Sequence, residues 1–216
     1  MVFETVKTLN MTAADLMRRI FISENEESKR FLSESGSAII LTAHLGNWEW
    51  AEQLIGLKAG NRETIISFLK VKNRYFNAVM LKIRGRFGNK AVRMEKVFRT
   101  ILENKENGVV AIFPADLEPG SRQKGLTINF LNQERLFFTG PENIATSLAL
   151  PVYYMSILKE KRGHYRIDLK LITNNAAIEP QNFVTQKYSS LLEKTVLERP
   201  ESWAGFVLMP VKTKNK

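Results

Sequence analysis

The chain has 216 residues, a length that fits a single domain. It has no cysteine and two histidines, which excludes disulfides and a cysteine nucleophile and argues against a zinc site. The formal net charge is +10, from 32 Lys and Arg against 22 Asp and Glu, and no apolar run approaches the ~18 residues of a membrane span. We therefore expect a protein that is soluble or only peripherally attached to a membrane.

The first half of the chain predicts strands that alternate with helices. Ser23 and Glu26 form an S-x-x-E capping box, which predicts a helix running to about Ser35. The apolar stretch SAIILTA (37–43) predicts a strand buried on both faces, and a helix is predicted after Gly46. Further predictions are a strand at 63–68, helices at 73–87 and 94–106, and a buried strand at 109–113.

The second half predicts an antiparallel part. The stretch 126–138 predicts a hairpin, and Gly140-Pro141 opens a helix because proline suits the first helical turn. Strands are predicted at 151–158 and 164–172, and a helix at 181–199. Alternating strands and helices indicate an α/β fold, with a mixed, mostly parallel central sheet flanked by helices. We expect one domain over residues 1–216.

The sequence AHLGNWEW places a histidine directly after the strand predicted at 37–43. On a continuous helix His44 and Glu49 would point about 140° apart, so they can meet only if His44 lies on the turn before the helix. Gly46 allows that bend, and open α/β sheets place ligands at the carboxyl ends of parallel strands. We interpret His44 as a general base oriented by Glu49, acting on a substrate hydroxyl or amine. The alternative is a capped, partly buried histidine at a strand–helix turn.

The segment 70–99 holds ten Lys or Arg and one acid, Glu95, so it carries almost the whole net charge. Three interpretations compete: a solvated helix face, a surface for an anionic membrane or acidic carrier, and a nucleic-acid site. The sequence lacks the RNP, KH and zinc-knuckle signatures of RNA-binding modules. We therefore expect no nucleic acid as a partner. His164, beside a predicted hairpin turn, is expected to be structural or exposed.

Several blocks resemble, in order, the bacterial lipid A biosynthesis acyltransferase family, which belongs to the glycerolipid acyltransferases with an H-x4-D/E motif. They are HLGNWEW (44–50), the basic NRYFNAVMLKIRGRFGNK (73–90), IFPADLEPG (112–120), INFLNQERLFFTGPENIA (128–145), LALPVYYM (148–155) and RPESW (199–203). The resemblance implies transfer of a fatty acyl chain from acyl carrier protein or a coenzyme A thioester to a hydroxyl or amine of a membrane glycolipid, such as a lipid A precursor. It implies no metal or other cofactor, and peripheral contact at the cytoplasmic face of the bacterial inner membrane.

The same resemblance makes His44 the catalytic base and Glu49 its partner. It also places an aspartate of the family at Asp116, whose alternative role is to cap a turn. The predicted substrate-binding residues are Asn47, Lys70, Arg74, Asp116, Arg122, Lys124, Gly140 and Glu142. Five aromatic side chains are interpreted either as the lining of an acyl groove or as plain core: Trp48, Trp50, Phe130, Phe137 and Phe138.

The sequence departs from the family pattern in several places. Family members usually begin with a membrane-spanning helix that is not found in this sequence, so we expect a shortened form; Phe68-Leu69-Lys70 stands where the family has Arg-Pro or Lys-Pro. Leu117 replaces the glutamine that usually follows the aspartate, and AGFVLMPVKTK (204–214) replaces an aromatic and Arg-rich closing segment. The last change supports a rival hypothesis, a catalytically silent lipid- or carrier-binding relative with the same fold.

Overall fold

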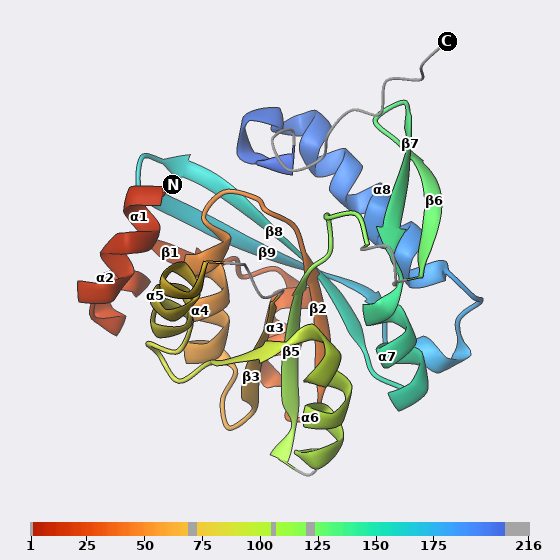
Figure 1. Cartoon of the computed structure of the whole chain (residues 1–216), viewed down its shortest axis with the longest axis horizontal. Coiled ribbons are helices and arrows are strands. Elements are labelled where there is room, and N and C mark those ends of the chain that lie inside the picture. Colours follow the sequence, from red (N-terminus) through yellow and green to blue (C-terminus); the bar gives the residue numbers. More distant parts are fainter. Residues whose placement is uncertain (1, 69–72, 105–106, 120–123, 206–216) are drawn as a thin grey trace.

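A seven-stranded sheet forms the centre of the molecule in the computed structural model, which describes residues 2–68, 73–104, 107–119 and 124–205 (Figure 1). The strand order is β1-β9-β8-β2-β5-β3-β4, and all neighbours are parallel except β8 and β9. These strands are β1 (Ile20–Ile22), β2 (Ala38–Thr42), β3 (Glu63–Phe68), β4 (Lys90–Arg93), β5 (Val109–Pro114), β8 (Val152–Lys161) and β9 (His164–Thr173). The predicted α/β fold with a mixed, mostly parallel sheet is confirmed.

Helices flank the sheet, and a hairpin stands beside it (Figure 1). The helices are α1 (Val2–Lys7), α2 (Ala13–Met17), α3 (Glu26–Ser33), α4 (Trp48–Lys58), α5 (Arg74–Arg84), α6 (Val97–Glu103), α7 (Gly140–Leu148) and α8 (Phe183–Glu198). The antiparallel hairpin consists of β6 (Gly125–Phe130) and β7 (Gln133–Phe138) and forms a sheet of its own. Helix α4 packs on β1 and β3, whereas α8 packs on β8, β9 and the hairpin.

The central strands β2 and β5 are buried along their whole length except for Pro114, which is partly exposed. Their side chains are mostly Ile, Val, Ala and Phe, which suits a parallel strand covered on both faces. The strands predicted at 37–43, 63–68 and 109–113 are therefore confirmed, as are the hairpin at 126–138 and the helices after Gly46 and at 181–199.

One local prediction was wrong, and one strand was missed. Helix α3 begins at Glu26 and is capped by Asn25, whose side-chain oxygen accepts the N–H of Ser28 at 2.7 Å. Ser23 does not cap it, because its own N–H continues the pairing of β1 by donating to the carbonyl of Ile167 at 2.8 Å. The short edge strand β4 was not predicted, since its sequence KAVR has only two apolar residues and lies in the basic segment.

Among the described residues, no helix combines the length and the apolar composition needed to cross a bilayer. The expectation of one domain over residues 1–216 stays a prediction.

Candidate active site

The register of two central strands brings His44 and Asp116 together. Strands β2 and β5 are parallel neighbours, and Thr42 lies opposite Pro114. His44 and Asp116 each follow two residues later, so both leave the sheet at the same edge. The imidazole Nδ1 lies 2.7 Å from Oδ1 of Asp116, and the backbone N–H of His44 donates to Oδ2 at 3.0 Å. This is the carboxyl end of the strands, where open α/β sheets hold their ligands.

The carboxylate of Asp116 is buried, with 1% of its surface exposed. A third donor, the indole N–H of Trp203, reaches its Oδ2 at 3.0 Å. A carboxylate can only accept hydrogen bonds, so Nδ1 of His44 carries the proton in this contact and Nε2 is left as the basic nitrogen. Asp116 therefore fixes the tautomer of His44 and prepares Nε2 to take a proton from a substrate.

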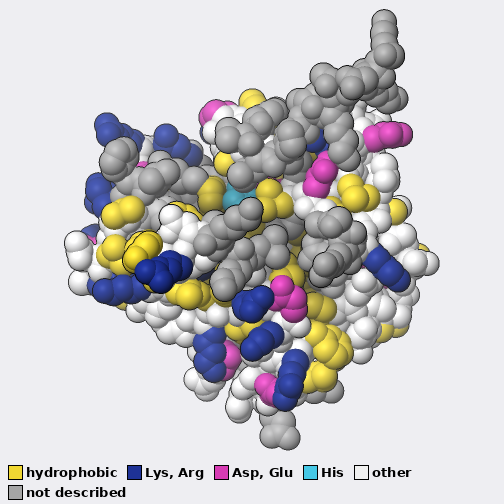
Figure 2. Space-filling view, in the orientation of Figure 1, with side chains coloured by type: hydrophobic (Ala, Val, Ile, Leu, Met, Phe, Trp, Pro, Cys, Tyr) yellow, Lys and Arg dark blue, Asp and Glu magenta, His cyan; other side chains and the backbone are white. Residues whose placement is uncertain are grey.

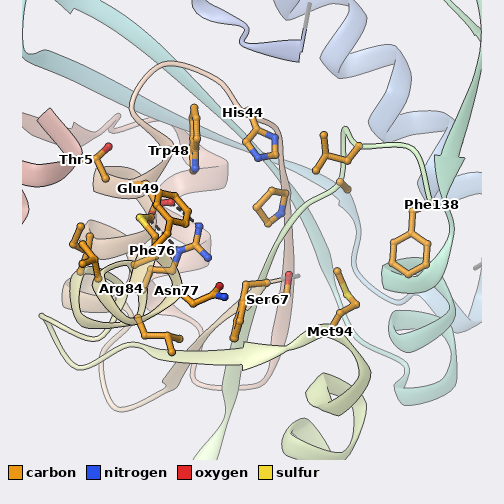
Figure 3. A pocket seen from close by; sticks show the side chains of 18 of the residues that line it. Thr5, His44, Trp48, Glu49, Ser67, Phe76, Asn77, Arg84, Met94 and Phe138 are labelled. Atoms are coloured by element: carbon orange, nitrogen blue, oxygen red, sulfur yellow. Dashed lines mark hydrogen bonds and ion pairs between the residues drawn. The ribbon is translucent and has the colours of Figure 1, made fainter. Parts of the chain in front are cut away.

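The contact predicted between His44 and Glu49 is corrected by the structure. Glu49 lies in the first turn of α4 and accepts two hydrogen bonds from Arg84 of α5, at 2.6 Å from Nη2 and 3.1 Å from Nε. Figure 3 shows this pair joined to each other and set apart from His44. Within the described part of the chain, the carboxylate that contacts His44 is that of Asp116. Sequence spacing alone could not reveal this, because Asp116 is distant in the chain.

His44 opens into a cavity of about 610 Å³ with mostly apolar walls (Figure 3). Its ring lies edge-on to that of Trp48, with ring centres 4.8 Å apart. Helix α5 supplies much of the wall, and the apolar lining comprises Val6, Trp48, Phe68, Tyr75, Phe76, Val79, Met80, Leu81, Ile83, Met94, Leu117 and Phe138. Figure 2 shows a histidine side chain on this face of the molecule, flanked by hydrophobic side chains. Such a cavity suits a hydrocarbon chain with reactive polar groups at one end.

The polar residues that line the cavity include His44, Glu49, Arg84 and Ser67. Arg84 uses Nε and Nη2 to hold Glu49, and among the described residues its Nη1 has no hydrogen-bond partner. A second acid on α4, Glu52, is fully buried, and neither of its carboxyl oxygens has a hydrogen-bond partner there. Burial, followed by the nearby charge of Glu49, raises the pKa of Glu52 well above its usual value, although Arg84 opposes the shift. The buried cluster thus combines an ion pair with an acid whose burial favours the protonated form.

Two of the residues predicted to contact substrate cap helices in the structure. Asn47 is fully buried, and its Oδ1 accepts the N–H of Trp50 at 3.1 Å, which caps α4. Glu142 is 6% exposed and accepts the N–H groups of Val184 and Thr185 at the start of α8, at 3.3 and 3.1 Å. Both side chains accept hydrogen bonds from free N–H groups at helix N-termini, and neither lines the cavity.

The remaining predicted substrate residues have mixed outcomes. Gly140 sits against the pocket residue Phe138: a Cβ atom there would lie 2.0 Å from its ring. Arg74 and Lys124 are exposed and do not line the cavity, and Arg74 lies over the Tyr75 ring at 4.7 Å. Lys70 and Arg122 lie outside the described residues.

The aromatic residues divide between the two interpretations offered from the sequence. Trp48 and Phe138 line the cavity, whereas Trp50, Phe130 and Phe137 are buried core. The sequence did not single out Arg84 or Trp203 as site residues, although both lie in blocks of the family resemblance. Within the described ranges, no group of three or more acidic or histidine side chains gathers as a metal site.

Comparison with known proteins gives one match. The family model described as bacterial lipid A biosynthesis acyltransferase matches residues 1–207, which is nearly the whole chain. A search of curated proteins gives no match.

Proposed function

The chain belongs to the bacterial lipid A biosynthesis acyltransferase family and is an acyltransferase, and from this premise we propose that it moves a fatty acyl chain from a thioester donor to a membrane glycolipid, with His44 as the base. The donor is acyl carrier protein or coenzyme A, and the acceptor is a hydroxyl or amine of a lipid A precursor. The observation that carries the proposal is the 2.7 Å contact between His44 and Asp116 at the wall of an apolar cavity.

In the proposed reaction, Nε2 of His44 takes the proton of the acceptor hydroxyl as its oxygen attacks the thioester carbonyl. The new ester C–O bond forms, the C–S bond breaks, and the imidazolium returns the proton to the departing thiolate. Asp116 keeps the imidazole in the right tautomer and stabilises the imidazolium that forms between the two steps. General-base assistance of this kind contributes about 10² to 10⁴ in rate.

The cavity accounts for binding of both substrates. Its apolar walls offer the acyl chain an environment free of water, with the thioester beside His44. Arg84 also lines the cavity and donates Nε and Nη2 hydrogen bonds to Glu49, whereas its Nη1 donates none to the described residues and could bind an anionic group such as a phosphate of the acceptor.

The rim of the cavity explains how a lipid acceptor would reach the site. On α5, Tyr75, Phe76 and Val79 are 69%, 51% and 43% exposed, and they share the helix with Arg74 and Lys82. Aromatic and apolar side chains beside cations suit the interface of an anionic bilayer. We propose that the protein makes peripheral contact through α5, at the cytoplasmic face of the bacterial inner membrane.

The test is transfer of a labelled acyl chain from acyl carrier protein or coenzyme A to a lipid A precursor in vesicles. His44→Ala is expected to lower kcat by about 10² to 10⁴, because the base is lost. His164→Ala, which removes the second histidine of the sequence, should keep wild-type activity. Unchanged kcat in His44→Ala would refute the mechanism. A wild-type protein that binds vesicles or carrier protein but transfers nothing from either donor would favour the silent relative.

A further inference from the structure

A segment near the end of the described chain is fastened to the turn that carries His44. The backbone N–H of Gly46 donates to the carbonyl of Ser202 at 2.7 Å, and the N–H of Ala204 donates to the carbonyl of His44 at 2.9 Å. These two bonds flank Trp203, so its side chain is delivered to the site from a part of the sequence about 160 residues away from the histidine.

The indole of Trp203 is itself firmly seated. The residue is 6% exposed, and its ring packs edge-on against Phe130 of the β6–β7 hairpin, with ring centres 5.7 Å apart. Its N–H points at Oδ2 of Asp116 at 3.0 Å, the same oxygen that accepts the backbone N–H of His44. The other oxygen, Oδ1, is the one that faces the imidazole. Trp203 therefore holds Asp116 through Oδ2, and Oδ1 is left to accept the hydrogen bond from the imidazole.

We infer that Trp203 is a positioning residue of the acyl transfer reaction, acting through Asp116 on the base His44; the inference rests on the proposed function. It fixes the orientation of the carboxylate and withdraws part of its negative charge through a charge-assisted hydrogen bond. The carboxylate that faces the imidazole is then correctly oriented, and its negative charge is reduced.

The groups around Asp116 allow this effect to be isolated. Besides His44, two titratable side chains interact with the charge of Asp116: Tyr154 of β8 and Tyr188 of α8. Burial, followed for Tyr188 by the charge of Asp116, raises the pKa of both hydroxyls, so both stay neutral. The Tyr154 hydroxyl donates to Oγ1 of Thr195, and the Tyr188 hydroxyl donates to the backbone carbonyl of Thr42. Neither hydroxyl therefore competes with the indole for the carboxylate.

The first test is Trp203→Phe, which keeps an aromatic ring but removes the N–H. We expect kcat to fall about 10-fold with little change in KM, since hydrogen bonds to charged groups are worth roughly that factor or more. The acid limb of the pH–rate profile should move upward by about half a pH unit or more, because the unmoderated carboxylate favours the imidazolium. Trp50→Phe is the matched control, since it removes another buried indole hydrogen bond, to Thr8 at 2.9 Å. Trp50→Phe is expected to leave the acid limb of the pH–rate profile unchanged.

The second test keeps the tryptophan and moves it. A Cβ atom on Gly205 would lie 1.9 Å from Cε2 and Cζ2 of Trp203, so Gly205→Ala forces the indole away from Asp116. It should reproduce the kcat loss and the shifted limb of Trp203→Phe. Gly36→Ala serves as its control, because a Cβ atom there meets nothing within 4 Å. A melting curve of each variant verifies that it is folded.

A readout without substrate separates this inference from the proposed function. The sequence has two histidines, so the imidazole signals of ¹⁵N-histidine-labelled protein are simple to assign with His164→Ala. In folded Trp203→Phe and Gly205→Ala, the titration midpoint of His44 should move upward while that of His164 stays in place. Suppose that the wild-type protein transfers no acyl chain but the two variants still shift the His44 midpoint relative to wild type. The proposed function is then refuted, and the coupling of Trp203 to His44 through Asp116 stands. An unmoved His44 titration in both folded variants would overturn the inference.

Discussion

At the scale of single residues, the site depends on which carboxylate reaches the imidazole. The sequence singled out His44 correctly as a residue at the end of a buried strand, and it named Asp116 only as a substrate contact. The contact between them follows from the β2–β5 register, which pairs Thr42 with Pro114 and cannot be read from local spacing. Glu49, five residues from His44, instead faces α5 and forms a nearly buried ion pair with Arg84. Long-range pairing therefore prevailed over nearness in sequence.

The buried acid Glu52 gives a prediction for stability. Its pKa in the folded protein is raised by burial first and by Glu49 second, so it contributes stability below the unfolded pKa that is lost as pH rises toward the folded pKa. Glu52→Gln removes this loss without changing the shape of the side chain. The unfolding free energy of Glu52→Gln relative to wild type should therefore increase from pH 5 to pH 8 by about 1 kcal/mol or more.

Urea unfolding of both proteins at the two pH values measures this difference. Glu26→Gln is the control, because the Glu26 side chain is 93% exposed and its replacement should give a difference that stays flat. A difference for Glu52→Gln that is equally flat would mean that Glu52 is ionised in the fold.

At the scale of elements, α5 has two tasks. It provides a large part of the cavity wall, and several of its lining side chains are also exposed to solvent, among them Tyr75, Phe76 and Val79. The sequence predicted this helix from its amphipathic pattern, although not which apolar residues would be left in solvent. That division depends on where α4 and the sheet cover the helix, which is a tertiary fact.

The exposed face of α5 predicts a loss of membrane binding in Phe76→Ser/Val79→Ser. Removing two apolar side chains from the interface should weaken binding to vesicles containing anionic lipid by at least about 10-fold, at ~25 cal/mol per Å² of apolar surface. Ile178→Ser is the control, because this residue is 78% exposed but lies beside α7, away from the cavity. Sedimentation with vesicles gives the affinities. Equal binding by the double variant and the control would place the membrane contact elsewhere.

Elements with a strong local signal were predictable, and the weak ones were not. Strands β2, β3 and β5 are runs of apolar or β-branched residues, and their near coincidence with the predicted ranges follows from burial on both faces. The edge strands β1 and β4 have three and four residues and owe their existence to pairing with β9 and β3. Helix α3 shows the same effect, because the pairing of β1 took Ser23 out of the predicted capping box.

At the scale of the whole molecule, the described part of the basic segment, residues 73–99, is divided among several elements. It runs through a helix, an edge strand and a second helix. Several of its cations are paired with acids: Arg84 with Glu49, Lys90 with Glu63, Arg93 with Glu95 and Arg99 with Glu103. The net charge of +10 is thus a property of the sequence that only partly becomes an anion-attracting surface. Composition could not separate paired from unpaired cations.

The molecule as a whole brings the site together from distant segments. The base follows the carboxyl end of β2, and its carboxylate follows the carboxyl end of β5. Helices α4 and α5 contribute to the cavity, and the segment around residue 203 provides the donor that holds the carboxylate. Each contribution depends on the central sheet and its register. The activity should therefore be most sensitive to the carboxylate at which these segments meet.

The most direct measurement is kcat for acyl transfer by Asp116→Asn. The amide cannot hold the Nδ1 proton of His44 as the carboxylate does, so the account predicts that kcat falls by about 10³ or more while the protein stays folded. A folded Asp116→Asn protein whose kcat lies within about threefold of the wild type would contradict it.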